Sequence, residues 1–354
     1  MKNLIQAYKL FENRINEVDS YIDNMMSQSD VLSGLLNLEV SEKQKEYLQY
    51  LQSSTGKTIQ YNAVIISLYG SFENFIDSII SNYLDIVFLN TRAYEELPVK
   101  IQGKYKNKIG DFLSNPQHFY GIDTPVIKII ENYFEVLKSN FNGNINKEFL
   151  LMHSGNLRMD QVCSIMTELG IENIGQKIFR HPLMKSFQIN ILGFDENDYD
   201  LKVSRNRPEI SIYLDKLVEQ RNSVAHGWVE ENRISVYDLR TYVIPFLKKL
   251  SQVILRLLLC EAYIYNVSDP TGFSKTPLKV IDNHIVCLHI LGQAIANGDF
   301  VIYKIKNDFK CAQITKIEID REPIDSITGV ECDVGFEIDA KITKESEIHM
   351  FISN

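Results

Sequence analysis

The chain has 354 residues, of which 45% are hydrophobic and 23% charged, so it can bury the cores of two ordinary domains. This composition excludes an intrinsically disordered chain. The net charge of −9 counts against a nucleic-acid enzyme without excluding one, because phosphate binding usually leaves a basic footprint.

The cysteines and the N-terminus indicate the compartment. Five cysteines stand singly, with no CxxC pair and no Cys/His cluster at zinc-finger spacing, which predicts reduced thiols and no metal or other cofactor. The first residues, MKNLIQAYKLFENRI, alternate charged and apolar side chains, unlike a signal peptide. The longest uncharged runs, residues 58–72 and 283–298, fall short of a membrane helix. We therefore expect a soluble, cytoplasmic protein with no membrane partner.

The first part of the chain has helical periodicity. Up to about residue 267, apolar residues recur mostly at three- and four-residue spacing, as they do on the buried face of a helix. The longest such segment should lie at the centre of an all-α bundle. The predicted helices are residues 4–27, 41–53, 58–88, 96–113, 124–140, 158–169, 208–227 and 235–265.

The pattern changes after SDPTGFSKTP, residues 268–277, which collects turn-forming residues. Beyond it, short runs alternate apolar and polar residues and are rich in β-branched side chains, which is typical of strands: HIVCLHI, DFVIYKI, FKCAQITKIEID, VGFEIDAKI and SEIHMFI. The predicted fold class is α plus a small all-β module. A helical bundle occupies residues 1–267, a linker residues 268–282, and a small β-barrel or sandwich residues 283–354.

The most informative segment for function is LDKLVEQRNSVAHGW, residues 214–228. On a helix, Arg221 falls within the apolar stripe of this segment, about 20° from Leu214. Asn222 and His226 are four residues apart, so their side chains are neighbours at the edge of that stripe. Gly227 is a natural helix stop.

This spacing gathers a permanent cation, an amide and an imidazole that titrates near neutral pH. Arginine can stabilise the extra charge of a phosphorane, and His226 can transfer a proton, so the set suits a phosphodiester without any metal. A structural interpretation stays open: Arg221 can pair with a buried carboxylate, and a histidine near a helix end can simply cap it.

The segment RNSVAHG resembles the RxxxxH motif of the HEPN superfamily, common there as R-N-x-x-A-H-G. Residues 68–84, LYGSFENFIDSIISNYL, resemble the earlier central helix of its bacterial ribonuclease branch, where S-F-E-x-F recurs. Residues 155–171, GNLRMDQVCSIMTELGI, resemble the linking segment of that branch. Together these matches cover most of residues 1–265 in the expected order.

The resemblance implies a helical bundle that pairs as a homodimer, with two motifs forming one composite site. Such family members cleave RNA without metal, by attack of the ribose 2′-hydroxyl, and leave a 2′,3′-cyclic phosphate. Carried onto this sequence, Arg221 and His226 are the catalytic pair, and Asn222 positions the phosphate.

Other residues are weaker candidates, each with a structural alternative. Glu73 can orient Arg221 or His226, or can be an ordinary helix-surface residue. Trp228 can stack on a base, or can close the helix end against the core. The basic residues Lys104, Lys106 and Lys108 can contact RNA or form a solvated surface. His153 and His181 lack partners at ligand spacing and are expected to be structural.

The C-terminal strands resemble the second-domain β-barrel of translational GTPases such as elongation factor Tu, through a GD turn, an xCxxITxIxID strand, an EPID stretch and a VGFEI strand. This loose match implies that the tail directs the enzyme to tRNA or another translation-associated RNA. Stabilising the dimer or binding a regulatory protein are the alternatives.

The leading hypothesis is an RNA endonuclease that acts as a toxin or as an effector of antiviral defence. Its expected partners are RNA, a second copy of the chain, and an antitoxin or defence-complex protein. The alternative is a HEPN scaffold that binds RNA or a partner protein without cutting. The presence of all three motif residues favours catalysis.

Overall fold

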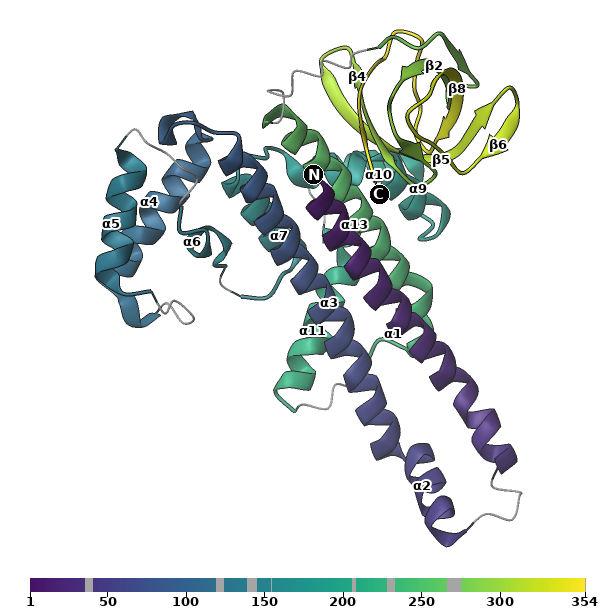
Figure 1. The fold of residues 1–354 in the computed structure, drawn as a ribbon. Helices are drawn as coiled ribbons and strands as arrows, with labels where there is room; N and C mark the ends of the chain where they lie inside the picture. Colours follow the sequence, from purple (N-terminus) through teal and green to yellow (C-terminus); the bar gives the residue numbers. More distant parts are fainter. Residues whose placement is uncertain are drawn as a thin grey trace.

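The computed structural model describes residues 1–35, 41–118, 124–138, 145–153, 155–205, 208–227, 233–265 and 275–353. Its helices come first along the chain and its strands last (Figure 1). This order confirms the predicted fold class, an all-α part followed by a small antiparallel β module. Residues 268–274 of the predicted linker, 268–282, lie outside the described residues, and its residues 279–281 form a short strand, so the exact domain boundaries stay predictions.

The helices of the described residues match most of the predicted ranges and add a group between residues 174 and 204. They are α1 (Lys2–Leu35), α2 (Glu42–Gln52), α3 (Ser54–Leu89), α4 (Val99–Ser114), α5 (Val126–Leu137), α6 (Glu148–Leu151), α7 (Met159–Glu168), α8 (Ile174–Arg180), α9 (Pro182–Asn190), α10 (Glu196–Ser204), α11 (Ile212–Ala225), α12 (Val236–Asp238) and α13 (Ile244–Tyr265). Short 3₁₀ turns lie at Tyr94–Glu96, Pro116–His118 and Pro208–Ile210, and a π-helical turn, Leu239–Val243, joins α12 to α13.

Helix α3 is the centre of the helical part, as its periodicity predicts. Its first turn is capped by the Ser53 hydroxyl, which accepts the Gly56 N–H at 3.0 Å. A continuous stripe of apolar side chains is buried along it, and α1, α13 and α11 pack against it. Figure 1 shows α1 and α3 side by side as a long arm that carries α2 at its far end. Helix α3 therefore provides the rigid surface on which α11 is positioned.

Helix α3 is also long and apolar enough to cross a membrane by length and composition. Half of its most apolar window is buried inside the structure, as expected for the central helix of a bundle. No other described helix meets this criterion.

The described strands form a curved antiparallel half-barrel (Figure 1). They are β1 (Lys279–Ile281), β2 (Ile285–Leu291), β3 (Ile295–Ala296), β4 (Phe300–Ile305), β5 (Asp308–Ile319), β6 (Glu322–Ile324), β7 (Ser326–Ile327), β8 (Glu331–Ile338) and β9 (Glu347–Ile352). The order in the main sheet is β1-β2-β8-β5-β4-β9, with β6 on β5, and β3 pairs with β7. The register sets Val286 of β2 opposite Phe336 of β8, so alternate side chains face a small core.

The β module packs directly on helix α13. Side chains from β4, β5 and β9 join the hydrophobic core of the helical part: Phe300, Ile302, Cys311 and Ile352. The Arg256 guanidinium of α13, which is 1% exposed, forms an ion pair with the Asp339 carboxylate that follows β8. The hydroxyl of Tyr263 lies 3.3 Å from Nδ1 of His349. These contacts hold the two parts of the chain together.

Candidate functional site

The Arg221 side chain is held by neutral groups. Its guanidinium carbon lies 5.0 Å from the centre of the Tyr69 ring on α3, at cation–π distance. Its Nη1 donates to Oδ1 of Asn156 and to Oδ1 of Asn222, each at 3.2 Å. Among the described residues, no carboxylate forms an ion pair with Arg221. The buried-carboxylate interpretation therefore has no support among the described residues.

The segment of residues 155–158, before α7, fixes this arrangement. Nδ2 of Asn156 donates to Oδ1 of Asn222 at 3.0 Å, and the Leu157 N–H donates to the Tyr69 hydroxyl at 3.1 Å. Arg158 pairs with Glu219 of α11 at 3.2 Å. Because these bonds connect the segment to both α3 and α11, they limit how far the Arg221 side chain can move.

His226 lies at the end of α11, one turn beyond Asn222. Its backbone N–H donates to the Asn222 carbonyl at 3.0 Å, and Gly227 follows in the left-handed conformation with φ 68°. The imidazole side chain is exposed. Arg221, Asn222 and His226 thus occupy the same end of α11, with Arg221 held in place and His226 exposed.

Glu73 reaches Arg221 through Tyr69. The Tyr69 hydroxyl donates to Oε1 of Glu73 at 3.2 Å, while the ring of the same tyrosine lies under the guanidinium. Burial raises the pKa of Tyr69, and Glu73 raises it further, so the phenol stays protonated and keeps donating. We call Tyr69, Asn156, Arg221, Asn222 and His226 the Arg221 site.

Sequence reasoning did not single out Tyr69 and Asn156. Tyr69 lies in residues 68–84 and Asn156 in residues 155–171, and neither stands out from its neighbours in the sequence. The available signal was their presence in the two segments that resemble HEPN proteins. Their contacts to Arg221 depend on tertiary packing, which helical spacing does not report.

A family model described as RiboL-PSP-HEPN matches residues 9–259, and this range contains every member of the Arg221 site. The chain belongs to the RiboL-PSP-HEPN family. The sequence-based assignment to the HEPN superfamily is therefore confirmed, and members of this superfamily are often ribonucleases or RNA-binding proteins. No curated protein and no solved structure matches the chain. The β module lies outside the range matched by the RiboL-PSP-HEPN model.

Two histidines of the RiboL-PSP-HEPN range differ in their surroundings. Nε2 of His153 lies 3.2 Å from Oδ1 of Asp77 on α3, and this hydrogen bond raises the pKa of His153. His153 therefore has an acidic partner that its sequence context did not reveal, and it anchors the segment that carries Asn156. His181 is half-buried, and desolvation lowers its pKa to about 4; its Nδ1 accepts the Leu183 N–H at the start of α9. This histidine is a helix cap.

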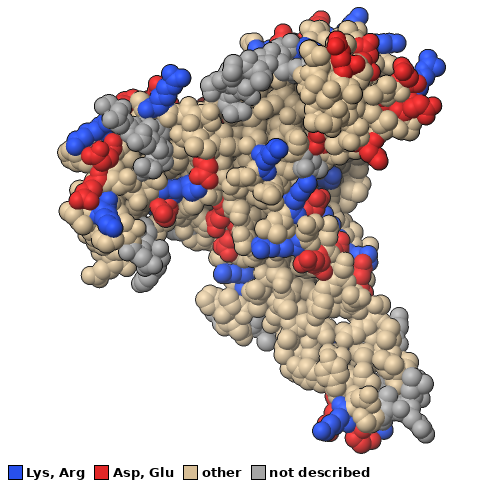
Figure 2. All heavy atoms as spheres, viewed as in Figure 1, with Lys and Arg blue, Asp and Glu red and all other residues tan. Residues whose placement is uncertain are grey.

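The lysines proposed for RNA binding lie on α4, which Figure 1 shows well separated from α11. Lys104 is buried and pairs with Glu168 at 2.9 Å, so its charge is neutralised within the protein. Lys106 is exposed and Lys108 half-buried. On the face of the molecule that Figure 2 shows, basic and acidic side chains are interspersed, without an extended patch of one sign. Trp228 lies outside the described residues.

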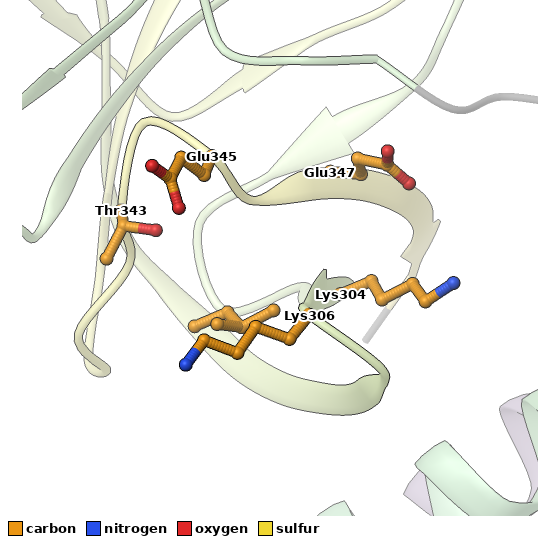
Figure 3. Close-up of a pocket in the computed structure, with 6 residues that line it drawn as sticks. Lys304, Lys306, Thr343, Glu345 and Glu347 are labelled. Carbon is orange, nitrogen blue, oxygen red and sulfur yellow. The ribbon is translucent and has the colours of Figure 1, made fainter.

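The β module carries a hollow of about 240 Å³, lined by Lys304, Lys306, Thr343, Glu345 and Glu347 with Ile305. Figure 3 shows the ammonium groups of Lys304 and Lys306 pointing in opposite directions, and Glu347 pointing away from Glu345. In a ligand site the polar groups converge on one point, whereas these charged groups point apart. Among the described residues, no group of three His, Cys, Asp or Glu side chains is placed to hold a metal ion.

Proposed function

We propose that this RiboL-PSP-HEPN protein is a metal-independent RNA endonuclease. The observation that carries the proposal is the fixed Arg221 guanidinium, which the described residues leave without an acidic partner, at the same end of α11 as the exposed His226. A phosphodiester in the attacked state gains negative charge, and a prepositioned guanidinium stabilises that charge without reorganisation.

Each motif residue has a distinct role in the proposed reaction. The ribose 2′-oxygen attacks the adjacent phosphorus, the bond to the 5′-oxygen breaks, and a 2′,3′-cyclic phosphate and a 5′-hydroxyl result. His226 removes or returns the proton in transit. Oδ1 of Asn222 accepts hydrogen bonds from both Arg221 and Asn156, so its NH₂ group is the part that can contact a phosphate oxygen.

Metal independence has a direct test. With RNA and excess EDTA, we expect the purified protein to cleave at the same rate as without the chelator, because Arg221 supplies the charge stabilisation that a metal would otherwise give. The rates are compared by gel over the same time course. Loss of cleavage in EDTA, restored by added Mg²⁺, would contradict this mechanism.

The site is proposed to be composite, formed by two copies of the chain. Ile59 and Ile66 of α3 are 54% and 43% exposed, and their seven-residue spacing places them on one face of the helix. This uncovered apolar stripe ends one turn before Tyr69, which supports pairing of a second copy beside the Arg221 site. Two copies of Arg221 and His226 would then share one phosphodiester.

An obligate heterodimer of wild-type and Arg221→Ala chains tests this arrangement. If both copies contribute to one site, the heterodimer should lose most of its activity per dimer, as measured in single-turnover cleavage. The matched control pairs a wild-type chain with a chain changed at an exposed arginine just beyond the end of α3, Arg92→Ala. Full wild-type activity in the Arg221→Ala heterodimer would exclude a shared site.

The proposed biological role is a toxin or an antiviral-defence effector, held in check by an antitoxin or a defence-complex partner. The β module, fixed on α13 by Arg256 and Asp339, is proposed to direct the enzyme to tRNA or another translation-associated RNA. The competing proposal is a HEPN scaffold that binds RNA or protein without cutting. The net charge of −9 favours the protein-binding form of that alternative, because phosphate binding usually leaves a basic footprint.

A further inference from the structure

We propose that Arg233, Tyr61 and the hollow beside them bind a nucleotide of the RNA strand a short distance from the scissile phosphodiester. This inference rests on the proposed function, since it assigns a second binding position for the same substrate. Three features of the described residues support it. They are a second arginine–tyrosine stack, a hollow whose described lining has no acidic residue, and a hydrogen bond from Tyr61, which belongs to both, to α11.

Arg233 repeats the arrangement of Arg221. Its guanidinium carbon lies 5.4 Å from the centre of the Tyr61 ring, and its Nη1 donates to the Thr58 hydroxyl at 3.3 Å. The side chain is exposed, and no carboxylate of the described residues pairs with it. A stacked arginine without an acidic partner keeps its positive charge and its planar set of donors for an anion.

The two stacks lie along the same helix. Tyr61 and Tyr69 are eight residues apart on α3, which corresponds to about 12 Å along the helix axis. The Tyr61 hydroxyl donates to Oε1 of Gln220 at 2.7 Å, and Gln220 directly precedes Arg221. A single RNA strand with one phosphate at Arg221 therefore reaches Arg233 within a few nucleotides.

A hollow of about 220 Å³ adjoins the Arg233 stack, because Tyr61 also lines it. Its walls combine apolar side chains with amides, including Met25, Leu51, Val236, Gln52 and Gln60. Apolar walls can cover the face of a base, and amides can bond its edge, which is how proteins usually bind unpaired bases in RNA.

The charge of the hollow favours a nucleotide over an apolar peptide side chain. Its described lining includes the cation Lys57 and no carboxylate. This local excess of positive charge contrasts with the net charge of the whole chain, which is −9. With Arg233 at Tyr61, two cations therefore flank an apolar space. One nucleotide can place its phosphate on Arg233 and its base in the hollow, and so match both the cations and the apolar space.

The test measures binding to a short 2′-O-methyl RNA, which lacks the attacking hydroxyl and cannot be cut by the proposed reaction. Fluorescence anisotropy gives the Kd over a range of salt concentrations. Arg233→Ala should weaken binding about tenfold and lower the slope of log K against log salt by about 0.7, the value for one lost phosphate contact on a single strand. The control Arg92→Ala changes an exposed arginine just beyond the other end of α3 and should leave both quantities unchanged.

The hollow is tested with Val236→Trp, which fills it, and with Gln60→Ala, which removes one amide. Val236→Trp should weaken binding about fivefold or more, because a stacked base is lost, while the salt slope stays at the wild-type value. Gln60→Ala should weaken it less. In cleavage of ordinary RNA, Arg233→Ala should raise KM and leave kcat near wild type.

The inference would be overturned if Arg233→Ala bound RNA with the Kd and the salt slope of the wild-type protein. It would also be overturned if Val236→Trp and Gln60→Ala both bound RNA with the wild-type Kd. If the wild-type protein binds RNA but never cleaves it, the proposed nuclease fails while these binding measurements still decide the nucleotide position. If an apolar peptide occupies the hollow instead, Val236→Trp will leave RNA binding unchanged, which also contradicts the inference.

Discussion

The His226→Ala protein is expected to lose RNA cleavage by about 10²–10⁴-fold, the usual contribution of a general acid–base residue. The fold should survive, because the His226 side chain is exposed at the end of α11 and the buried residues of that helix, Leu214, Leu217 and Val218, are unchanged. Single-turnover cleavage gives the rate, and a thermal melt checks the fold. A His226→Ala protein that cleaves at the wild-type rate would remove this residue from the mechanism.

Arg221→Lys is the matched variant for the other member of the pair. Lysine keeps the positive charge but lacks the planar fork that contacts Asn156, Asn222 and the Tyr69 ring together. We expect a loss of about 10²–10³-fold in the rate, comparable to removing one donor that stabilises the attacked state. A rate equal to wild type would show that charge alone, without orientation, is sufficient.

The second large effect concerns stability. Asp339→Ala should lower the free energy of unfolding by about 3–5 kcal/mol, because it leaves the Arg256 guanidinium buried without its counter-charge. Two nitrogens of this guanidinium, Nε and Nη1, already have no hydrogen-bond partner among the described residues. Asp339 also accepts the Gln313 N–H at 2.9 Å, so the sheet loses an acceptor as well.

Urea unfolding of the full chain measures this change. The double variant Arg256→Met with Asp339→Ala is the control, because it removes both charges and should recover much of the lost stability. A loss below about 1 kcal/mol in Asp339→Ala, in the range of exposed ion pairs, would mean that the Arg256–Asp339 pair does not hold the β module on α13.

The long helices could be predicted from the sequence because their periodicity extends over many turns. The predicted range 58–88 corresponds to α3, Ser54–Leu89, and the range 235–265 to the π-helical turn with α12 and α13. Helices α8, α9 and α10 were not predicted. Each spans at most nine residues, and His181–Pro182 interrupts the pattern between the first two, so too few turns remain to show a period.

The strands show the same dependence on length. The predicted strand ranges correspond to β2, β4, β5, β8 and β9, which have six or more residues each; β2 shows the clearest alternation of buried and more exposed side chains. Strands β1, β3, β6 and β7 have two or three residues each and were not predicted. Such short pairings depend on the neighbouring strand and leave no alternation in the sequence.

For the candidate site, the sequence could predict only what one helix brings together. Arg221, Asn222 and His226 share α11, so their grouping follows from helical spacing. Tyr69 and Asn156 reach Arg221 from distant segments, and the Asp77 partner of His153 lies 76 residues away. Among the described residues, an aromatic ring and two amides hold Arg221, and helical spacing alone does not predict these contacts.

The most direct test of the central claim is to incubate the purified protein with total cellular RNA in EDTA, beside the His226→Ala protein, and to map the new RNA ends by sequencing. We predict new ends with 2′,3′-cyclic phosphates for the wild-type protein and none for the variant. RNA that is bound but left uncut by the wild-type protein, or identical cleavage by both proteins, would contradict the proposed nuclease.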